Sequence, residues 1–138
     1  MTITITRELP SREQLLALYD SVGWSAYTCE PDRLERAAAA SLAVFTAWDG
    51  PHLAGLLRAV GDGETILYIQ DLLVTPAWQR RGVGRRLMAA CLEAYPHVRQ
   101  KVLLTDHTEG NLAFYRACGF LPSGDYGCAA LLRLENIP

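Results

Sequence analysis

The segment 79–86, QRRGVGRR, gathers two glycines and four arginines directly after an apolar run. A helix that begins here presents unpaired backbone N–H groups and the positive end of its dipole. Gly82 and Gly84 let a ligand approach the backbone, and the arginines can donate charge-assisted hydrogen bonds to phosphate. The pattern predicts a site for a small polyphosphate ligand, with a glycine turn and a solvated helix end as the alternative. The third glycine of a dinucleotide fingerprint and the lysine of a P-loop are missing.

The composition is that of an ordinary globular chain. It has 138 residues, half of them apolar, and a formal net charge of −2, so we expect one domain over residues 1–138. That charge argues against a nucleic-acid partner, and no apolar stretch approaches the ~20 residues that span a bilayer. The N-terminus has no secretion signal. The cysteines form no C-x-x-C pair and no histidine lies at metal-ligand spacing, which predicts a reduced, cytoplasmic protein without a metal. Three cysteines lie in apolar segments and are expected to be buried: Cys91, Cys118 and Cys128.

Local patterns predict a mixed α+β fold, with a mostly antiparallel sheet and helices on both faces. Strand-like runs occupy residues 3–6, 41–48, 52–60, 64–74, 101–105 and 128–134. The run at 101–105 is continuously apolar and is expected to be buried on both faces. Helices are predicted after a Ser11–Gln14 capping box, at 31–40, from Val83 to the stop at Pro96, and at 111–118.

Two motifs in sequence order resemble those of the GNAT superfamily of acetyl-CoA-dependent N-acetyltransferases. The phosphate-binding signature of that family is matched by Gln79, Gly82 and Gly84, after the run LLVTP. About thirty residues later, NLAFYRACGF matches its second signature at Asn111, Phe114, Tyr115, Gly119 and Phe120. The resemblance covers nearly the whole chain and implies a GNAT-like sheet that splays between its fourth and fifth strands.

The resemblance also implies where acetyl-CoA binds. The pantetheine arm is expected in the splayed gap, against the main chain of Leu72, Leu73 and Val74, where one N–H serves as the oxyanion donor. The pyrophosphate is expected on the segment Gln79, Arg80, Arg81, Gly82, Val83, Gly84 and Arg85. Asn111 is expected either to bind the cofactor arm or to cap its helix.

The catalytic residues expected from the family pattern are an acid and a base. Tyr115 matches the residue that protonates the departing thiolate, and a packed aromatic is its alternative. The glutamate that many relatives carry as a base is absent, and Tyr68, Gln70 and Asp71 stand there instead. Strict alternation places Asp71 on the face of Ile69 and Leu73, although a family bulge near this point leaves the face open.

Asp71 lies inside an apolar strand, where a carboxylate is either functional or paired with a cation, and we favour function. Asp106 resembles an aspartate at the edge of the same gap in small-amine and arylalkylamine acetyltransferases, and is the second candidate base. His107 beside it has a suitable side chain, with a solvated loop histidine as the alternative.

The acceptor is expected to be a small primary amine. The stretch 18–24, LYDSVGW, resembles the small-amine branch of the family, and Tyr19, Trp24, Tyr27 and Tyr68 are candidates for lining the acceptor pocket. Acetylation of a protein lysine or N-terminus is one alternative, and a non-catalytic acyl-CoA-binding module is another. No nucleic acid, membrane or metal partner is expected, and the assembly is left open between a monomer and a homodimer.

Overall fold

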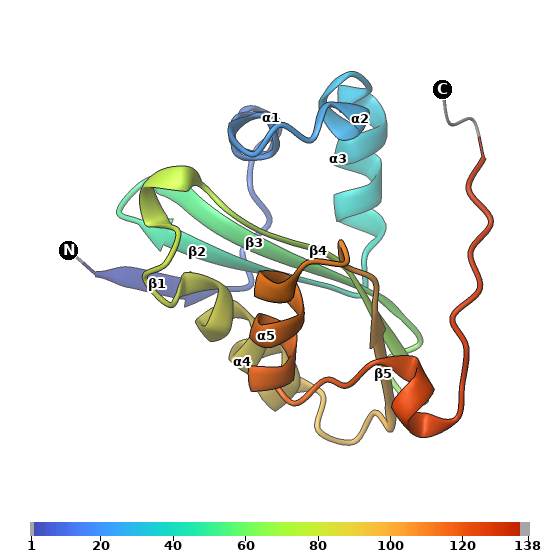
Figure 1. The fold of residues 1–138 in the computed structure, drawn as a ribbon. Helices are drawn as coiled ribbons and strands as arrows, with labels where there is room; N and C mark the ends of the chain where they lie inside the picture. The colour runs from blue at the N-terminus through green and yellow to red at the C-terminus, as the bar shows by residue number, and fades with distance from the viewer. Residues whose placement is uncertain (1, 136–138) are drawn as a thin grey trace. The chain divides into compact units, whose positions relative to one another are not determined.

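The computed structural model describes residues 2–135 and divides the chain into two compact units, one ending at Leu104 and one beginning at Thr105. The first unit contains a five-stranded sheet in the order β1-β2-β3-β4-β5 (Figure 1). Its strands are β1 (Ile3–Thr6), β2 (Ala43–Asp49), β3 (His52–Gly61), β4 (Ile66–Val74) and β5 (Gln100–Leu103). Its helices are α1 (Arg12–Ser21), α2 (Ser25–Thr28), α3 (Pro31–Ala40) and α4 (Val83–Ala94), with a 3₁₀ turn at Pro76–Trp78.

Local sequence signals explain most of these elements. The side chain of Ser11 accepts the N–H of Gln14, whose own side chain accepts the N–H of Ser11, so the predicted capping box starts α1. The turn between β2 and β3 contains Gly50 at a φ of 57°, a conformation that glycine adopts without strain. The mixed α+β class and the predicted antiparallel strands before α4 are confirmed.

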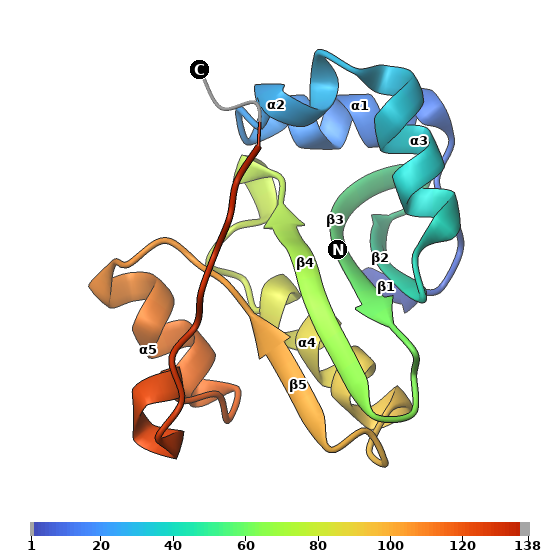
Figure 2. The same ribbon diagram turned by 90° about the vertical axis from the view of Figure 1, so that its right-hand side faces the viewer.

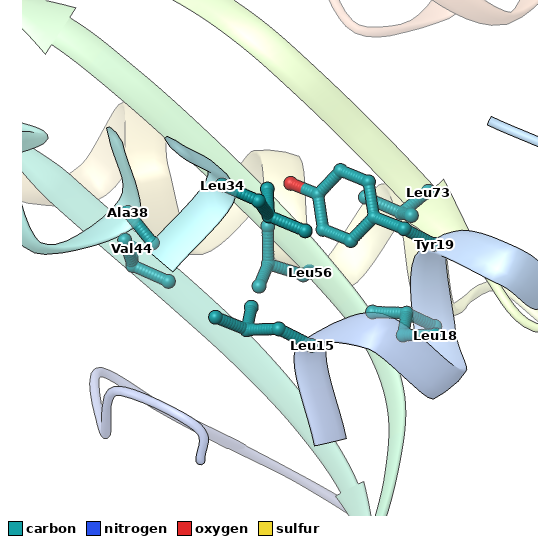
Figure 3. Close-up of a cluster of buried hydrophobic side chains, with 8 residues drawn as sticks. All are labelled: Leu15, Leu18, Tyr19, Leu34, Ala38, Val44, Leu56 and Leu73. Atoms are coloured by element: carbon teal, nitrogen blue, oxygen red, sulfur yellow. The ribbon is translucent and has the colours of Figure 1, made fainter. Parts of the chain in front are cut away.

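Helices cover both faces of the sheet. In Figure 1, α1, α2 and α3 lie on one face and α4 on the other. Figure 3 shows the apolar cluster under the first group, in which Leu15, Leu18 and Tyr19 of α1 meet side chains of α3 and the strands. The buried side chains of α4 are Val83, Leu87, Met88 and Cys91.

The sheet opens between β4 and β5. The two strands pair in parallel only from Ile66 opposite Gln100 to Ile69 opposite Leu103. β4 then continues through 70–74, where the described residues provide no partner on that side, and Figure 2 shows the two strands diverging. β5 is half-buried rather than buried on both faces, because it is the edge strand of the sheet.

The second unit contains α5 (Glu109–Ala117) and a 3₁₀ turn at Ser123–Tyr126. The strand predicted at 128–134 is wrong, since these residues have no regular structure and Leu131 is 91% exposed. An apolar run becomes a strand only when another strand pairs with its backbone, and no described segment does so here. The cysteine expectation is also partly wrong, because Cys128 is exposed and only Cys91 is buried.

Candidate functional site

The first helical turn of α4 follows the free end of β4 and is open at its N-terminus. Gly82 is the N-cap residue at a φ of 80°, and no described side chain caps the helix. The first intrahelical hydrogen bond from this cap runs from the N–H of Arg86 to the carbonyl of Gly82 at 3.1 Å, which leaves the N–H groups of the first turn available. A Cβ atom built on Gly82 would meet no atom within 4 Å, so there is room beside these donors.

The loop before α4 is held by its own side chains. The amide of Gln79 donates to the carbonyl of Val74 at 2.9 Å, which ties the loop to the end of β4. Arg80 has a φ of 63°, uncommon for a residue other than glycine and a form of strain that is concentrated at functional sites. The guanidinium of Arg81 lies 4.9 Å from the centre of the Trp78 ring. Arg86 donates to the carbonyl of Ile3 at 2.9 Å, so its side chain links α4 to β1 and is not one of the cations beside the loop.

A buried polar network lies at the other end of the free stretch of β4. Asp71 is 3% exposed, and its Oδ2 accepts from Arg58 Nε of β3 at 2.8 Å and from the Tyr19 hydroxyl at 2.9 Å. Its Oδ1 accepts from the Tyr27 hydroxyl at 2.7 Å. The Tyr27 oxygen accepts in turn from Arg58 and from the exposed side chain of Gln70, at 3.3 and 3.2 Å.

A β-bulge turns Asp71 toward these partners. Arg58 pairs with Asp71 and Ala59 with Ile69, so Gln70 is the extra residue of β4. Residues opposite each other across a strand pair point to the same face, and therefore Asp71 and Ile69 point to opposite faces. Strict alternation, which grouped Asp71 with Ile69, is thus wrong at this position.

Of the two interpretations of a carboxylate inside an apolar strand, the pairing is confirmed, because Asp71 forms an ion pair with the buried Arg58. A catalytic role for Asp71 stays a prediction. Arg58 was not predicted from the sequence, because a single arginine in an apolar run does not indicate which residue it pairs with. Burial and then the Asp71 charge raise the pKa values of Tyr19, Tyr27 and Tyr68, so these phenols stay protonated at neutral pH.

Three of the predicted acceptor aromatics form one cluster. The ring of Tyr19 lies edge-on to Trp24 and to Tyr27, with centroids 5.9 and 5.0 Å away. Tyr27 belongs to α2, a four-residue helix that the sequence analysis did not predict. Its ring also lines a cavity of about 220 Å³ between α2 and α3, where the charges of Glu30 and Arg33 pair at 3.3 Å.

The other two predicted catalytic residues, Tyr115 and Asp106, lie in the second unit. Tyr115 of α5 is half-buried, with its ring edge-on to Phe114 at 5.0 Å. Burial and then the neighbouring Cys118 raise the pKa of Tyr115, while a hydrogen bond with the Thr105 side chain opposes the rise. The phenol is therefore protonated at neutral pH, as a general acid must be.

The loop before α5 carries the predicted residues Asp106 and His107, and α5 itself carries Asn111. Asp106 and His107 are exposed. Thr108, not Asn111, caps the helix, since its hydroxyl accepts the N–H of Asn111 at 3.1 Å. The capping alternative for Asn111 is therefore wrong, and its side chain instead donates to the Asp106 carbonyl at 3.4 Å.

Within residues 2–135, no three His, Cys, Asp or Glu side chains are grouped to hold a metal ion. In the same range, no helix has the length and apolar character needed to cross a membrane.

Comparison with known proteins gives consistent matches. The sequence model described as the acetyltransferase (GNAT) family matches residues 9–120. An uncharacterized ycf52-like N-acetyltransferase of Prochlorococcus marinus is 31% identical over 121 residues, which are 83% of this chain and 63% of that protein. The chain thus spans less than two thirds of that relative.

Solved structures share the fold. A GNAT family acetyltransferase of Streptococcus pneumoniae is 37% identical, with a TM-score of 0.86 over 99% of this chain and 100% of its own. AAC(6')-Iy, solved with the bisubstrate analogue CoA-S-monomethyl-acetylneamine, is 16% identical, with a TM-score of 0.68 over 99% of this chain and 100% of its own. At that identity, the likeness shows the fold alone.

Proposed function

Because this chain belongs to the GNAT family of acetyltransferases, we propose that it transfers an acetyl group from acetyl-CoA to a primary amine of a small molecule. The observation that supports the proposal is the succession of two main-chain binding surfaces. The free edge of β4 at 70–74 is followed by the uncapped N-terminus of α4 at Gly82. CoA carries amide groups along an extended arm and then a pyrophosphate, so its chemistry fits this order.

Each surface has the donors that its part of CoA requires. The main chain of Leu72, Leu73 and Val74 can pair with the amide-bearing arm as an added strand would. The first-turn N–H groups of α4 and the nearby arginines suit a pyrophosphate. The residues proposed to contact it are Gln79, Arg80, Arg81, Gly82, Val83, Gly84 and Arg85. AAC(6')-Iy, with the same fold, was solved with a CoA-containing analogue, which supports this assignment.

The proposed acid is Tyr115, which donates its hydroxyl proton to the thiolate as the amide forms. A raised pKa keeps that proton in place at neutral pH. Tyr115→Phe removes only the hydroxyl and is expected to lower kcat by about 10²–10⁴-fold, with CoA affinity retained in calorimetry. Full activity at every pH would return Tyr115 to the role of a packed aromatic.

The proposed proton acceptors are Asp71 and Asp106. Asp71 has no direct access to a substrate because it is buried in its network, so it can act only through another group. Asp106 is exposed and can act directly or through water. Asp106→Asn is expected to lower kcat/KM at neutral pH, with a deficit that shrinks as the free amine becomes abundant. If the rate–pH profile of the variant overlays that of the unmodified enzyme, Asp106 is not the proton acceptor.

The decisive experiment for the function is release of free CoA thiol from acetyl-CoA. The panel contains an alkylamine, an arylalkylamine, a polyamine and a lysine peptide, each run with and without enzyme. We expect thiol release with at least one small amine and an N-acetyl product of matching mass. Release with the peptide alone would support a protein substrate, and CoA binding without any release would support a binding module.

A further inference from the structure

The two tyrosines that bind Asp71 differ in their access to the surface. The Tyr19 side chain is fully buried, at 0% exposure, whereas Tyr27 is half-buried. The Tyr27 hydroxyl is also hydrogen-bonded to the exposed amide of Gln70. Gln70 is the first residue of β4 after the last pair with β5, so this end of the network reaches the start of the free edge. Tyr27 therefore connects a buried carboxylate to the place where the strands separate.

We propose that Tyr27 relays a proton from the acceptor ammonium group to Asp71, and that Gln70 occupies the position of this ammonium group when no amine is bound. The proposal rests on the function proposed above. An ammonium N–H is a stronger donor than the amide N–H of Gln70, whose hydrogen bond of 3.2 Å is long for its kind. The substrate can therefore replace Gln70 on the Tyr27 oxygen.

The proton transfer balances without another reactant. One N–H bond of the ammonium group breaks as a new O–H bond forms on Tyr27. The hydrogen that Tyr27 already donates moves to Oδ1 of Asp71, which becomes a neutral carboxylic acid while Tyr27 stays neutral. The amine then attacks as a free base, and Asp71 returns its proton to water through Tyr27. The second proton that nitrogen loses replaces the one that Tyr115 gives to the thiolate, so the overall reaction releases one proton.

The titratable groups that face Asp71 come from four elements of the first unit. The titratable groups around it are Tyr19 of α1, Tyr27 of α2, Arg58 of β3 and Tyr68 of β4. Only Arg58 is charged at neutral pH. Its guanidinium also donates to Ser41 and to Tyr27, each at 3.3 Å, so it keeps hydrogen-bond partners when Asp71 is neutral.

The test compares two substitutions that remove the same kind of hydrogen bond. Tyr27→Phe and Tyr19→Phe each delete one donor to Asp71, but only the first removes a hydroxyl that a substrate can reach. With one good amine, Tyr27→Phe is expected to lower kcat/KM at pH 7 by about 100-fold. Because the free amine becomes abundant as the pH rises, this deficit should shrink at alkaline pH. Tyr19→Phe should lose less, by the same factor at every pH.

A second variant measures binding instead of turnover. Gln70→Ala frees one acceptor position on Tyr27, and it changes an exposed side chain that the fold does not need. In calorimetric titration, the amine should bind roughly two- to tenfold more tightly, the value of one hydrogen bond. Melting curves of all three variants establish that each is folded.

The outcomes separate this inference from the function on which it rests. If the unmodified protein releases no thiol with any amine, the proposed function is wrong, and the proton relay that depends on it is wrong as well. If the protein is active but Tyr27→Phe and Tyr19→Phe give parallel rate–pH profiles, the relay alone is wrong. Should Tyr27→Phe not fold, amine affinity in Gln70→Ala decides, and an unchanged or weaker affinity overturns the proposal.

Discussion

Two polar regions lie at the two ends of the free edge of β4, and their hydrogen-bonding groups are used in opposite ways. At the start, Asp71, Arg58, Tyr19 and Tyr27 satisfy one another, and no buried side-chain nitrogen or oxygen among the described residues lacks a hydrogen-bond partner. At the end, Gly82 begins α4 without a side-chain cap. The first arrangement favours a rigid scaffold and the second leaves donors for a ligand. The same strand therefore links a closed network to an open binding site.

The largest expected effect comes from breaking the closed network at its cation. Arg58→Met leaves the Asp71 carboxylate buried without a counter-charge, which should lower the free energy of unfolding by about 3–5 kcal/mol in denaturant titration. Arg33→Met is the matched control, because its ion pair with Glu30 is exposed and worth at most about 1 kcal/mol. A loss no larger than that of the control would mean that the network is not a closed, buried unit.

A substitution at the open start of α4 should change the affinity for CoA more than the free energy of unfolding. Gly82→Val places a β-branched side chain beside the α4 donors, and CoA affinity should fall at least about tenfold, the value of one charge-assisted hydrogen bond. The left-handed conformation adds a folding cost of about 1–2 kcal/mol.

Gly50→Val is the control for that strain. Gly50 is also left-handed and faces open space, but it lies in the β2–β3 turn. It should show a similar folding cost and keep CoA affinity. If the two variants bind CoA with equal affinity in calorimetry, the pyrophosphate does not bind beside Gly82.

A capped helix sharpens the contrast with the uncapped one. Ser11→Ala deletes the N-cap of α1, whose orphan N–H groups are satisfied by the chain itself. The free energy of unfolding should fall by about 1 kcal/mol, with CoA affinity unchanged. A weaker affinity for CoA would show that helix starts in this protein affect the ligand through the fold as a whole.

The smallest effect should come from ionising the closed network. Burial raises the pKa of Tyr19 above that of the unfolded chain, so the unfolded state loses its proton first as the pH rises. This contribution to stability is full below pH ~10 and is lost above it, by less than about 1 kcal/mol at pH 10.5. Unfolding titrations of Tyr19→Phe should lack this part of the alkaline loss, and identical slopes for both proteins would contradict the assignment.

Much of the fold follows from signals that act over three or four residues. The Ser11–Gln14 capping box, the proline at the start of α3 and the glycine before α4 were all interpreted correctly from the sequence. The helix α2 was missed because its four residues are too short for a periodic pattern. The strand at 128–134 was predicted wrongly, since an apolar pattern does not specify a pairing partner.

In the candidate site, too, some features follow from the local sequence and others from the tertiary structure. The sequence by itself determined the donor-rich start of α4, because glycines and arginines act there through their own backbone and charge. Only the tertiary structure decided the surroundings of Asp71. Its partners lie far along the chain, at Arg58, Tyr19 and Tyr27, and the extra residue Gln70 turns it toward them. A bulge and a buried ion pair depend on the register between strands, which the strands settle only as they pack together.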